Sequence, residues 1–180
     1  MKAISVLLRA IFGGVFIFSG FVKAVDPWGT AYKIEEYIYV FGMNWIVDSM
    51  PWILILLSII LCSLEFMIGV LIFFGFFPKL SKYSSVIIMA FFTVLTLIDA
   101  LTNKVDDCGC FGDAIKLTNW QTFWKNIVLD VLLAGIILIE RKMELGVSKV
   151  NSKLLTSIFG VFILFFSIYS SVYEPVIDFR

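Results

Sequence analysis

Residues 51–76 read PWILILLSIILCSLEFMIGVLIFFGF, an apolar run in which Glu65 is the one charged side chain. About 20 apolar residues are enough for a helix to cross the ~30 Å hydrocarbon core of a bilayer. Four other apolar stretches have nearly the same length, at 4–22, 83–101, 123–139 and 154–172. The sequence therefore predicts an all-α integral membrane protein with five spans.

The composition agrees with a chain that lies mostly in lipid. Hydrophobic residues make up 61% of the 180 residues, and charged residues make up 16%, against about 25% in soluble domains. The formal net charge is zero, so nothing suggests a nucleic-acid partner. The chain has no histidine, the commonest metal ligand, and its three cysteines are too few for a disulfide scaffold.

Basic residues predict the orientation. With the N-terminus inside, the inner segments hold eight basic and two acidic residues, and the outer segments hold six basic and nine acidic residues. Cytoplasmic loops of membrane proteins carry an excess of Lys and Arg. We therefore expect a multi-pass protein of the plasma (inner) membrane with a cytoplasmic N-terminus. The C-terminus and the loop at 102–122 are then extracytoplasmic, and the N-terminal apolar stretch is a retained span rather than a signal peptide.

The first outer loop, residues 23–50, contains a helix signal. Asp26 is a good N-cap and Pro27 suits the first helical position. Residues 31–39 then mix aromatic and charged side chains. This pattern predicts a short interfacial helix that lies at the lipid headgroups.

The second outer loop carries the most reactive side chains of the chain. Cys108 and Cys110 are separated by Gly109, in a compartment where disulfides form and persist. A disulfide closed over so short a loop would be strained, and strained disulfides are more easily reduced. This favours a redox-exchanging pair. Asp106 and Asp107 would raise the pKa values of these thiols, and Lys104 or Lys116 would offset that effect.

Two other interpretations of the cysteine pair stay open. Cys108 and Cys110 could form a structural disulfide or remain inert thiols. Metal binding is the weakest alternative, because two thiolates without a histidine make a poor site.

Three carboxylates lie within the apolar spans, namely Glu65, Asp99 and Asp130. Ionisable groups there are costly and usually face the bundle interior or a wet cavity. One interpretation is a polar pocket, open to the outer face, that serves as a proton path or binds a quinone headgroup. The other is a set of buried hydrogen bonds that hold the helices together.

The remaining polar positions are more ambiguous. Lys23 and Asp26 lie at the end of the first span. One interpretation is ordinary snorkelling and helix capping. The other is a role as a gate or thiolate partner for the cysteine loop. Cys62 lies about eleven residues below the outer end of its span, roughly 15 Å deep at about 1.5 Å per residue. We expect it to be a buried thiol, separated by depth from the cysteine loop.

Three segments resemble the DoxX/MauE-like membrane proteins. Residues 18–24, FSGFVKA, with Asp26 and Pro27 resemble the first-span signature, and Glu65 followed by IGVL at 68–71 resembles the second span. Residues 107–112, DCGCFG, resemble the CGCFG-type loop of the MauE-like branch, which is associated with disulfide chemistry outside the cytoplasm.

The resemblance covers residues 1–140 and implies a four-helix membrane bundle, similar to membrane thiol oxidoreductases that pass electrons to a quinone. Residues 141–180 add a fifth span and an outward tail.

Three functions follow as hypotheses. The first is a thiol–disulfide oxidoreductase in which Cys108 and Cys110 exchange with a thioredoxin-like extracytoplasmic protein and pass electrons to a quinone near Glu65, Asp99 or Asp130. The second is a non-catalytic membrane subunit or assembly factor for such a redox partner. The third is a small-solute carrier that uses the three carboxylates, which the absence of matched half-repeats disfavours.

Overall fold

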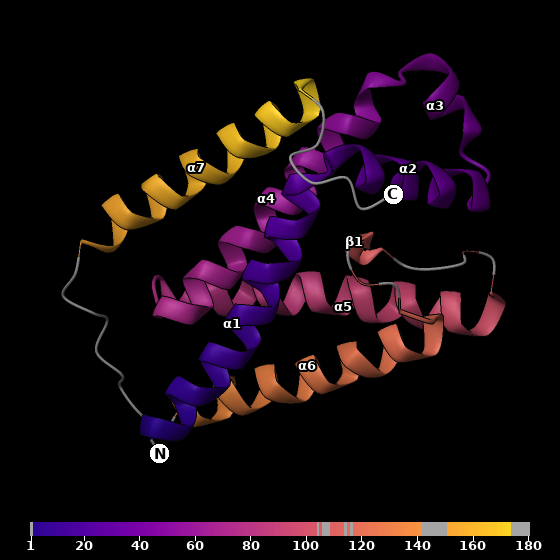
Figure 1. Cartoon of the computed structure of the whole chain (residues 1–180). Helices are drawn as coiled ribbons and strands as arrows, with labels where there is room; N and C mark the ends of the chain where they lie inside the picture. Colours follow the sequence, from indigo (N-terminus) through magenta and orange to yellow (C-terminus); the bar gives the residue numbers. More distant parts are fainter. Residues whose placement is uncertain are drawn as a thin grey trace.

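The five apolar stretches form five long helices in the computed structural model, and each predicted span is confirmed. The structure describes residues 2–103, 105, 109–113, 115, 117–141 and 151–173. In chain order the elements are α1 (Lys2–Val25), α2 (Pro27–Val40), α3 (Asn44–Ser49), α4 (Trp52–Phe74), α5 (Pro78–Thr102), β1 (Cys110–Asp113), α6 (Asn119–Arg141) and α7 (Ser152–Val172) (Figure 1). The all-α membrane fold expected from the sequence is therefore confirmed.

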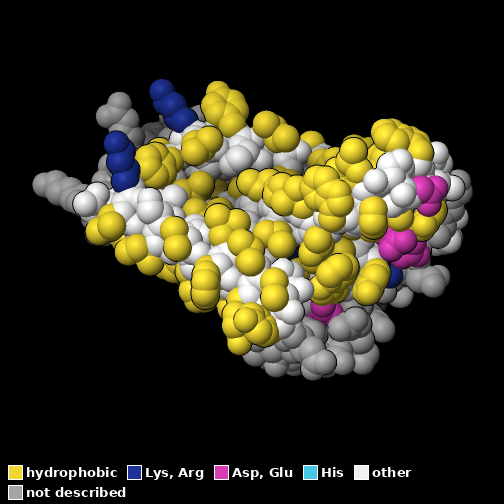
Figure 2. Space-filling model, turned by 90° about the horizontal axis from the view of Figure 1, so that it is seen from above, with side chains coloured by type: hydrophobic (Ala, Val, Ile, Leu, Met, Phe, Trp, Pro, Cys, Tyr) yellow, Lys and Arg dark blue, Asp and Glu magenta, His cyan; other side chains and the backbone are white. Residues whose placement is uncertain are grey.

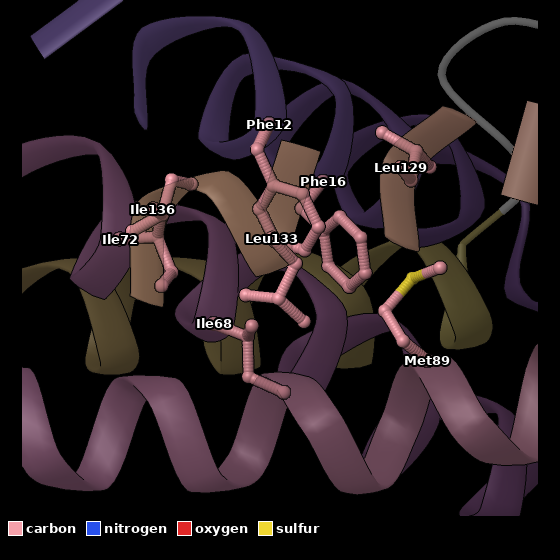
Figure 3. Packing of buried hydrophobic residues seen from close by; sticks show 8 residues of the cluster. All are labelled: Phe12, Phe16, Ile68, Ile72, Met89, Leu129, Leu133 and Ile136. Carbon is pink, nitrogen blue, oxygen red and sulfur yellow. The ribbon is translucent and has the colours of Figure 1, made fainter. Parts of the chain in front are cut away.

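Helices α1, α4, α5 and α6 form the four-helix bundle. The most extensive contacts join α1 with α4 and α5 with α6. Their shared core, drawn in Figure 3, contains Phe12 and Phe16 from α1, Ile68 and Ile72 from α4, Met89 from α5, and Leu129, Leu133 and Ile136 from α6. Because lipid tails are as apolar as this core, close van der Waals packing, rather than the hydrophobic effect, holds such helices together.

Glycines set the close approach of α1 to α4. A Cβ atom on Gly20 would lie 2.4 Å from the backbone nitrogen of Phe66, and one on Gly13 would lie 2.8 Å from the carbonyl oxygen of Gly69. The two helix backbones therefore touch along these positions. This contact fixes the position of α1 relative to Glu65 on α4. The site described below depends on that relative position.

The helix expected after the first span is confirmed as α2, while its position at the lipid headgroups stays a prediction. Asp26 is its N-cap, with an Oδ1 that accepts a hydrogen bond from the Gly29 amide at 3.1 Å, and Pro27 opens the helix. Ser58 of α4 donates to the Pro27 carbonyl at 2.6 Å, which fastens the start of α2 to the bundle. A second short helix, α3, follows α2 and was not predicted, because its six residues carry too weak a periodic signal.

An ionic cluster joins the helices at the end of the bundle where α1 begins. Glu140 of α6 pairs with Lys82 of α5 at 2.6 Å and with Arg9 of α1 at 3.7 Å. Arg9 also donates to the carbonyl oxygen of Ile72 at 2.9 Å, near the C-terminus of α4. All four bundle helices are thus tied at this end.

The surface between the two ends of the molecule is apolar. In Figure 2 hydrophobic side chains cover the middle of the visible face, Lys and Arg project at the left end, and Asp and Glu gather toward the right, where some basic side-chain atoms are also visible. This is the distribution expected of a protein whose midsection contacts lipid tails.

Helix α7 lies beside α4 and α1, outside the four-helix bundle (Figure 1). Aromatic pairs join it to the bundle: Phe166 stacks on Phe21 with ring centroids 5.4 Å apart, and Phe159 lies 6.5 Å from Phe66. Near the C-terminal end of α7, the Ser171 carbonyl accepts a hydrogen bond from the Trp28 indole of α2 at 2.9 Å. The fifth span is therefore attached to one side of the bundle.

Candidate functional site

Two glycines shape the cysteine loop around β1. Gly109 and Gly112 have φ values of +61° and +54°, a region that side-chain-bearing residues rarely adopt. The Gly112 amide donates to the Gly109 carbonyl at 3.0 Å and closes a tight turn. Cys110 lies inside this turn, so the glycines on either side of Cys110 determine where its backbone points.

The turn places Cys110 against a buried ion pair. Lys23 of α1 and Glu65 of α4 lie 2.6 Å apart, with side chains that are 5% and 2% exposed. Ser19, one helical turn before Lys23, is 2.7 Å from the second Glu65 oxygen and 2.6 Å from the Cys110 carbonyl oxygen. The cysteine loop is therefore linked through one hydroxyl to a charged pair inside the bundle.

The Ser19 hydroxyl carries a single hydrogen, which has a chemical consequence. It can donate to the Glu65 carboxylate or to the Cys110 carbonyl, but not fully to both at once. A change in the hydrogen bonding of Glu65 therefore changes the bond that holds the loop. Ser19 couples the electrostatic state of the ion pair to the position of the Cys110 backbone.

Aromatic rings and a second cation surround this centre. The Lys23 ammonium lies 5.5 Å from the centroid of the Phe92 ring, and the Lys125 ammonium lies 4.6 Å from that of Phe111. Phe111 also contacts Phe18, with ring centroids 5.7 Å apart. The strand that carries Cys110 is thus held to α1 and α6 by its own Phe111.

A small cavity with a volume of about 20 Å³ lies inside this cluster, lined by residues that include Ser19, Lys23, Glu65, Cys110 and Asn126. That volume accommodates about one water molecule, and the lining supplies enough polar partners to hold it.

A much larger cavity also borders Cys110. Its volume is about 750 Å³, and it runs between α4 and α5 beneath α2. Cys110, Lys23 and Tyr37 line part of it, whereas most of the remaining wall is aliphatic or aromatic. Cys110 therefore borders both a small polar space and a large apolar one.

The three intramembrane carboxylates do not form one pocket, contrary to the first interpretation of the sequence. Asp99 accepts a hydrogen bond from the Tyr37 hydroxyl, which links α5 to α2, and Asp130 accepts one from Thr93 at 2.8 Å, which links α6 to α5. Glu65 alone of the three lines either cavity beside the cysteine loop. The structure separates these carboxylates because their helices present them to different neighbours.

The supporting residues expected from the sequence have different places. Lys23 lies in the centre of the site. Asp26 is 5% exposed and caps α2, which is the structural role expected of it. Cys108 and Asp107 lie outside the described residues.

The depth predicted for the cysteine loop was wrong. Cys62 is fully buried, in a cluster with Ala24 and Phe66, and its sulfur lies 3.2 Å from the Ser167 hydroxyl, as a buried thiol should. However, the Cys110 carbonyl reaches Ser19, whose hydroxyl contacts Glu65, three residues further along α4 than Cys62. The described part of the loop at Cys110 therefore lies beside α1 near the depth of Cys62.

Sequence reasoning missed Ser19, Tyr37 and Lys125 as members of the site. For Ser19 a signal was present, because Ser19 and Lys23 are four residues apart and share one face of α1. For Tyr37 and Lys125 no local signal existed, since their contacts with Asp99 and Phe111 join distant segments.

Comparison with known proteins agrees with the resemblance carried by the cysteine loop. A family model described as "Methylamine utilisation protein MauE" matches residues 1–139, which include α1 to β1 and nearly all of α6. No curated protein sequence and no solved structure matches the chain. The matched region contains Ser19, Lys23, Glu65 and Cys110, and the chain belongs to the MauE family of membrane proteins.

Proposed function

We propose that this protein is a membrane thiol–disulfide oxidoreductase that accepts electrons from an extracytoplasmic thiol protein through Cys108 and Cys110. The observation that carries this proposal is the placement of Cys110 against the buried Lys23–Glu65 pair, with Ser19 between them. An intramembrane ion pair is costly and marks a functional site by default. Its position beside one of two neighbouring cysteines points to thiol chemistry.

The Lys23 ammonium supports that chemistry electrostatically. Thiol–disulfide exchange needs a thiolate, and a nearby cation stabilises the negative sulfur. Lys23 and Cys110 line the same small cavity, which also contains the Lys125 side chain. We therefore assign Cys110 as the sulfur that leaves as a thiolate beside these cations.

The exchange proceeds in two balanced steps. A partner thiolate attacks the Cys108 sulfur, which forms a mixed disulfide and releases Cys110 as a thiolate. The second partner thiol, once deprotonated, then attacks the mixed disulfide and releases Cys108. The partner gains a disulfide, and this chain gains two thiols with the two electrons and, in total, two protons. Cys108 receives the attack because Cys110 faces the interior cavities.

Trapping of the mixed disulfide tests this proposal. In the Cys110→Ser variant the Cys108 thiolate should attack the disulfide of the oxidised partner, an extracytoplasmic thioredoxin-like protein, in the reverse of the exchange. One partner sulfur leaves as a thiol, and the mixed disulfide should persist because Cys110 is no longer there to attack it. The matched Cys62→Ser variant should behave like the wild type, since Cys62 packs among apolar side chains. Adducts are detected on non-reducing gels and disappear with reductant.

Two outcomes would contradict the proposal. One is that Cys108 never forms an adduct and both loop thiols resist alkylation in membranes. The other is that a stoichiometric partner remains bound and active after both loop cysteines are changed to Ala, which would support a non-catalytic assembly subunit instead.

A further inference from the structure

We propose that a cavity at the end of the bundle where α1 begins binds the phosphodiester headgroup of an anionic membrane lipid. This cavity, called the Arg9 cavity below, has a volume of about 360 Å³, and its charged lining residues are Arg9 of α1, Lys82 of α5 and Glu140 of α6. The volume lies within the range of about 300–1,000 Å³ that is typical of small-molecule sites. The cavity lies at the opposite end of the bundle from β1 (Figure 1), so its ligand is independent of the proposed thiol exchange.

The Arg9 guanidinium is held in the cavity with donors to spare. Its Nε donates to the Ile72 carbonyl at 2.9 Å, whereas its Nη1 lies 3.7 Å from Glu140, which is too far for a hydrogen bond. The Arg9 side chain is 16% exposed, and the bond to Ile72 is the one hydrogen bond that it makes within the described part of the chain. A shielded charged group needs partners for its donors, and the planar guanidinium matches two oxygens of a phosphate. Arg9 therefore offers a forked pair of donors to an anion.

Gly75 makes room for this guanidinium. It follows the last residue of α4 with a φ of +70°, and a Cβ atom on Gly75 would lie 1.6 Å from the Arg9 Nη2. The guanidinium thus lies directly over the Gly75 backbone, where a side chain would displace it. Together with the bond to Ile72, this close approach fixes the orientation of Arg9 before a ligand arrives. A binding group that is already ordered costs less entropy when it binds.

The charged lining residues leave one positive charge uncompensated. Glu140 lies 2.6 Å from the Lys82 ammonium, and its other oxygen lies 3.7 Å from Arg9 and 3.3 Å from the Ser5 hydroxyl. Two cations and one carboxylate give these lining residues a net charge of +1. A phosphodiester carries one negative charge and would neutralise them. Glu140 is therefore a positioning residue that holds the two cations on either side of it.

The apolar lining of the cavity favours a lipid over a free anion. Val6 of α1 and Phe73 and Phe74 of α4 line the cavity and are 61%, 40% and 43% exposed. Phe74 also stacks on Phe159 of α7, with ring centroids 5.9 Å apart, which extends the apolar surface to the fifth span. A headgroup bound by Arg9 can therefore leave its acyl chains along these side chains. Free phosphate has no chains that could use this surface.

The Arg9 cavity also lies at the depth of a lipid headgroup. Gly75 directly follows α4, Lys82 lies in the second turn of α5, and Glu140 is the residue before the last of α6. These helices are long enough to cross the hydrocarbon core, so their ends lie near its boundary. The excess of basic residues predicts that this end faces the cytoplasm, and basic pockets between spans on that side bind anionic headgroups.

Lipid titration of charge variants provides the test. The full-length protein in a nonionic detergent is titrated with phosphatidylglycerol, which is anionic, or with phosphatidylcholine, which is neutral overall, and bound lipid is measured by native mass spectrometry. Arg9→Gln and Lys82→Gln should bind phosphatidylglycerol at least about tenfold more weakly than the wild type, because each loses a charge-assisted contact. The wild type should bind phosphatidylcholine similarly weakly. The control Lys79→Gln removes the same charge from an exposed residue of α5 outside the cavity lining, and it should match the wild type.

A second measurement separates the lipid from a free anion. A ligand that binds the folded state raises the midpoint of thermal unfolding. Phosphatidylglycerol should raise the midpoint of the wild type and of Lys79→Gln but not that of Arg9→Gln, and inorganic phosphate should raise none of them. Arg9→Lys keeps the charge but loses the forked donors, so its affinity should lie between those of the wild type and Arg9→Gln. Glu140 keeps one cation in every variant, and the midpoint without lipid shows which variants are folded.

Three outcomes would overturn the inference. If Arg9→Gln and Lys82→Gln bind phosphatidylglycerol as the wild type does, the lipid covers the apolar surface without using the cavity. If Lys79→Gln weakens binding as much as they do, the overall positive charge of this end attracts the lipid. If inorganic phosphate raises the midpoint as much as phosphatidylglycerol, the cavity is a site for a free anion. Should Arg9→Gln not fold, Lys82→Gln and Arg9→Lys decide the same question.

Discussion

At the scale of single residues, Lys23 and Glu65 hold two opposite charges out of water, at 2.6 Å from each other. Transfer of each charge from water is expensive, and their mutual attraction offsets that cost only while both are present. The Ser19 hydroxyl lies within hydrogen-bond distance of both Glu65 and the Cys110 carbonyl and shares its one hydrogen between them. The stability of the pair and the position of the loop are therefore linked.

Removal of one charge should destabilise the protein more than removal of both. Lys23→Met leaves the Glu65 carboxylate buried without its cation, and we expect a loss of about 3 kcal/mol in the free energy of unfolding. The double variant Lys23→Met/Glu65→Leu should recover most of that stability but not thiol exchange. Thermal unfolding in detergent micelles measures the stability of the single and the double variant. Equal destabilisation by the single and double variants would contradict a mutually compensating pair.

Loss of the Ser19 hydroxyl should loosen the cysteine loop. Ser19→Ala removes the contact with the Cys110 carbonyl, so alkylation of the loop thiols should become faster and stability should fall by about 1 kcal/mol. Ser84→Ala is the control, because Ser84 donates only to carbonyls of its own helix, α5, in the described part of the chain. An unchanged alkylation rate in Ser19→Ala would show that other contacts hold the loop.

At the scale of elements, the backbone contact between α1 and α4 controls the geometry of the site. Gly20 lies one residue after Ser19, and its Cα faces the α4 backbone at Phe66, next to Glu65. Any side chain there would push the helices apart and would lengthen the contacts of Ser19 and Lys23 with Glu65. The ion pair therefore depends on the close packing of α1 against α4.

Gly20→Ala should therefore be damaging, whereas Gly14→Ala should be tolerated. A Cβ on Gly20 would meet backbone atoms at 2.4–2.8 Å, and one on Gly14 would meet nothing within 4 Å. We expect Gly20→Ala to cost about 2 kcal/mol through overpacking, and Gly14→Ala to change stability by less than about 0.5 kcal/mol. The midpoint of thermal unfolding distinguishes the two. A tolerated Gly20→Ala would mean that α1 and α4 can separate without harm.

At the scale of the whole molecule, the distribution of charge defines an axis. The ionic cluster of Arg9, Lys82 and Glu140 lies at the end where α1 begins, while α2, α3 and β1 gather at the opposite end (Figure 1). The proposed exchange requires that the β1 end faces the extracytoplasmic space, where a thiol partner can reach Cys108.

Reporter fusions should confirm that orientation. Alkaline phosphatase joined after residue 180 should be active, because an odd number of spans carries the C-terminus to the side opposite the N-terminus. The same enzyme inserted within 142–150 should be inactive, and a fluorescent protein there should fold. The reverse pattern would place the cysteine loop in the cytoplasm and would remove the basis for exchange with an extracytoplasmic partner.

Much of this architecture follows from sequence pattern alone. The five spans, the cap of α2 by Asp26 and the membrane class follow from hydropathy and capping chemistry, which act over a few neighbouring residues. Residues 107–112 also identify the MauE family before any fold is known, and the family model over 1–139 confirms it.

Only the tertiary structure decided which polar residues meet. Glu65, Asp99 and Asp130 look alike in sequence, yet Glu65 joins Lys23 and Ser19 while Asp99 and Asp130 each bond a neighbouring helix. These contacts span many residues, and the rotation and spacing of packed helices set them, which no local pattern encodes. The position of the cysteine loop has the same origin, because the contact of Cys110 with Ser19 joins residues that are 91 positions apart in the chain.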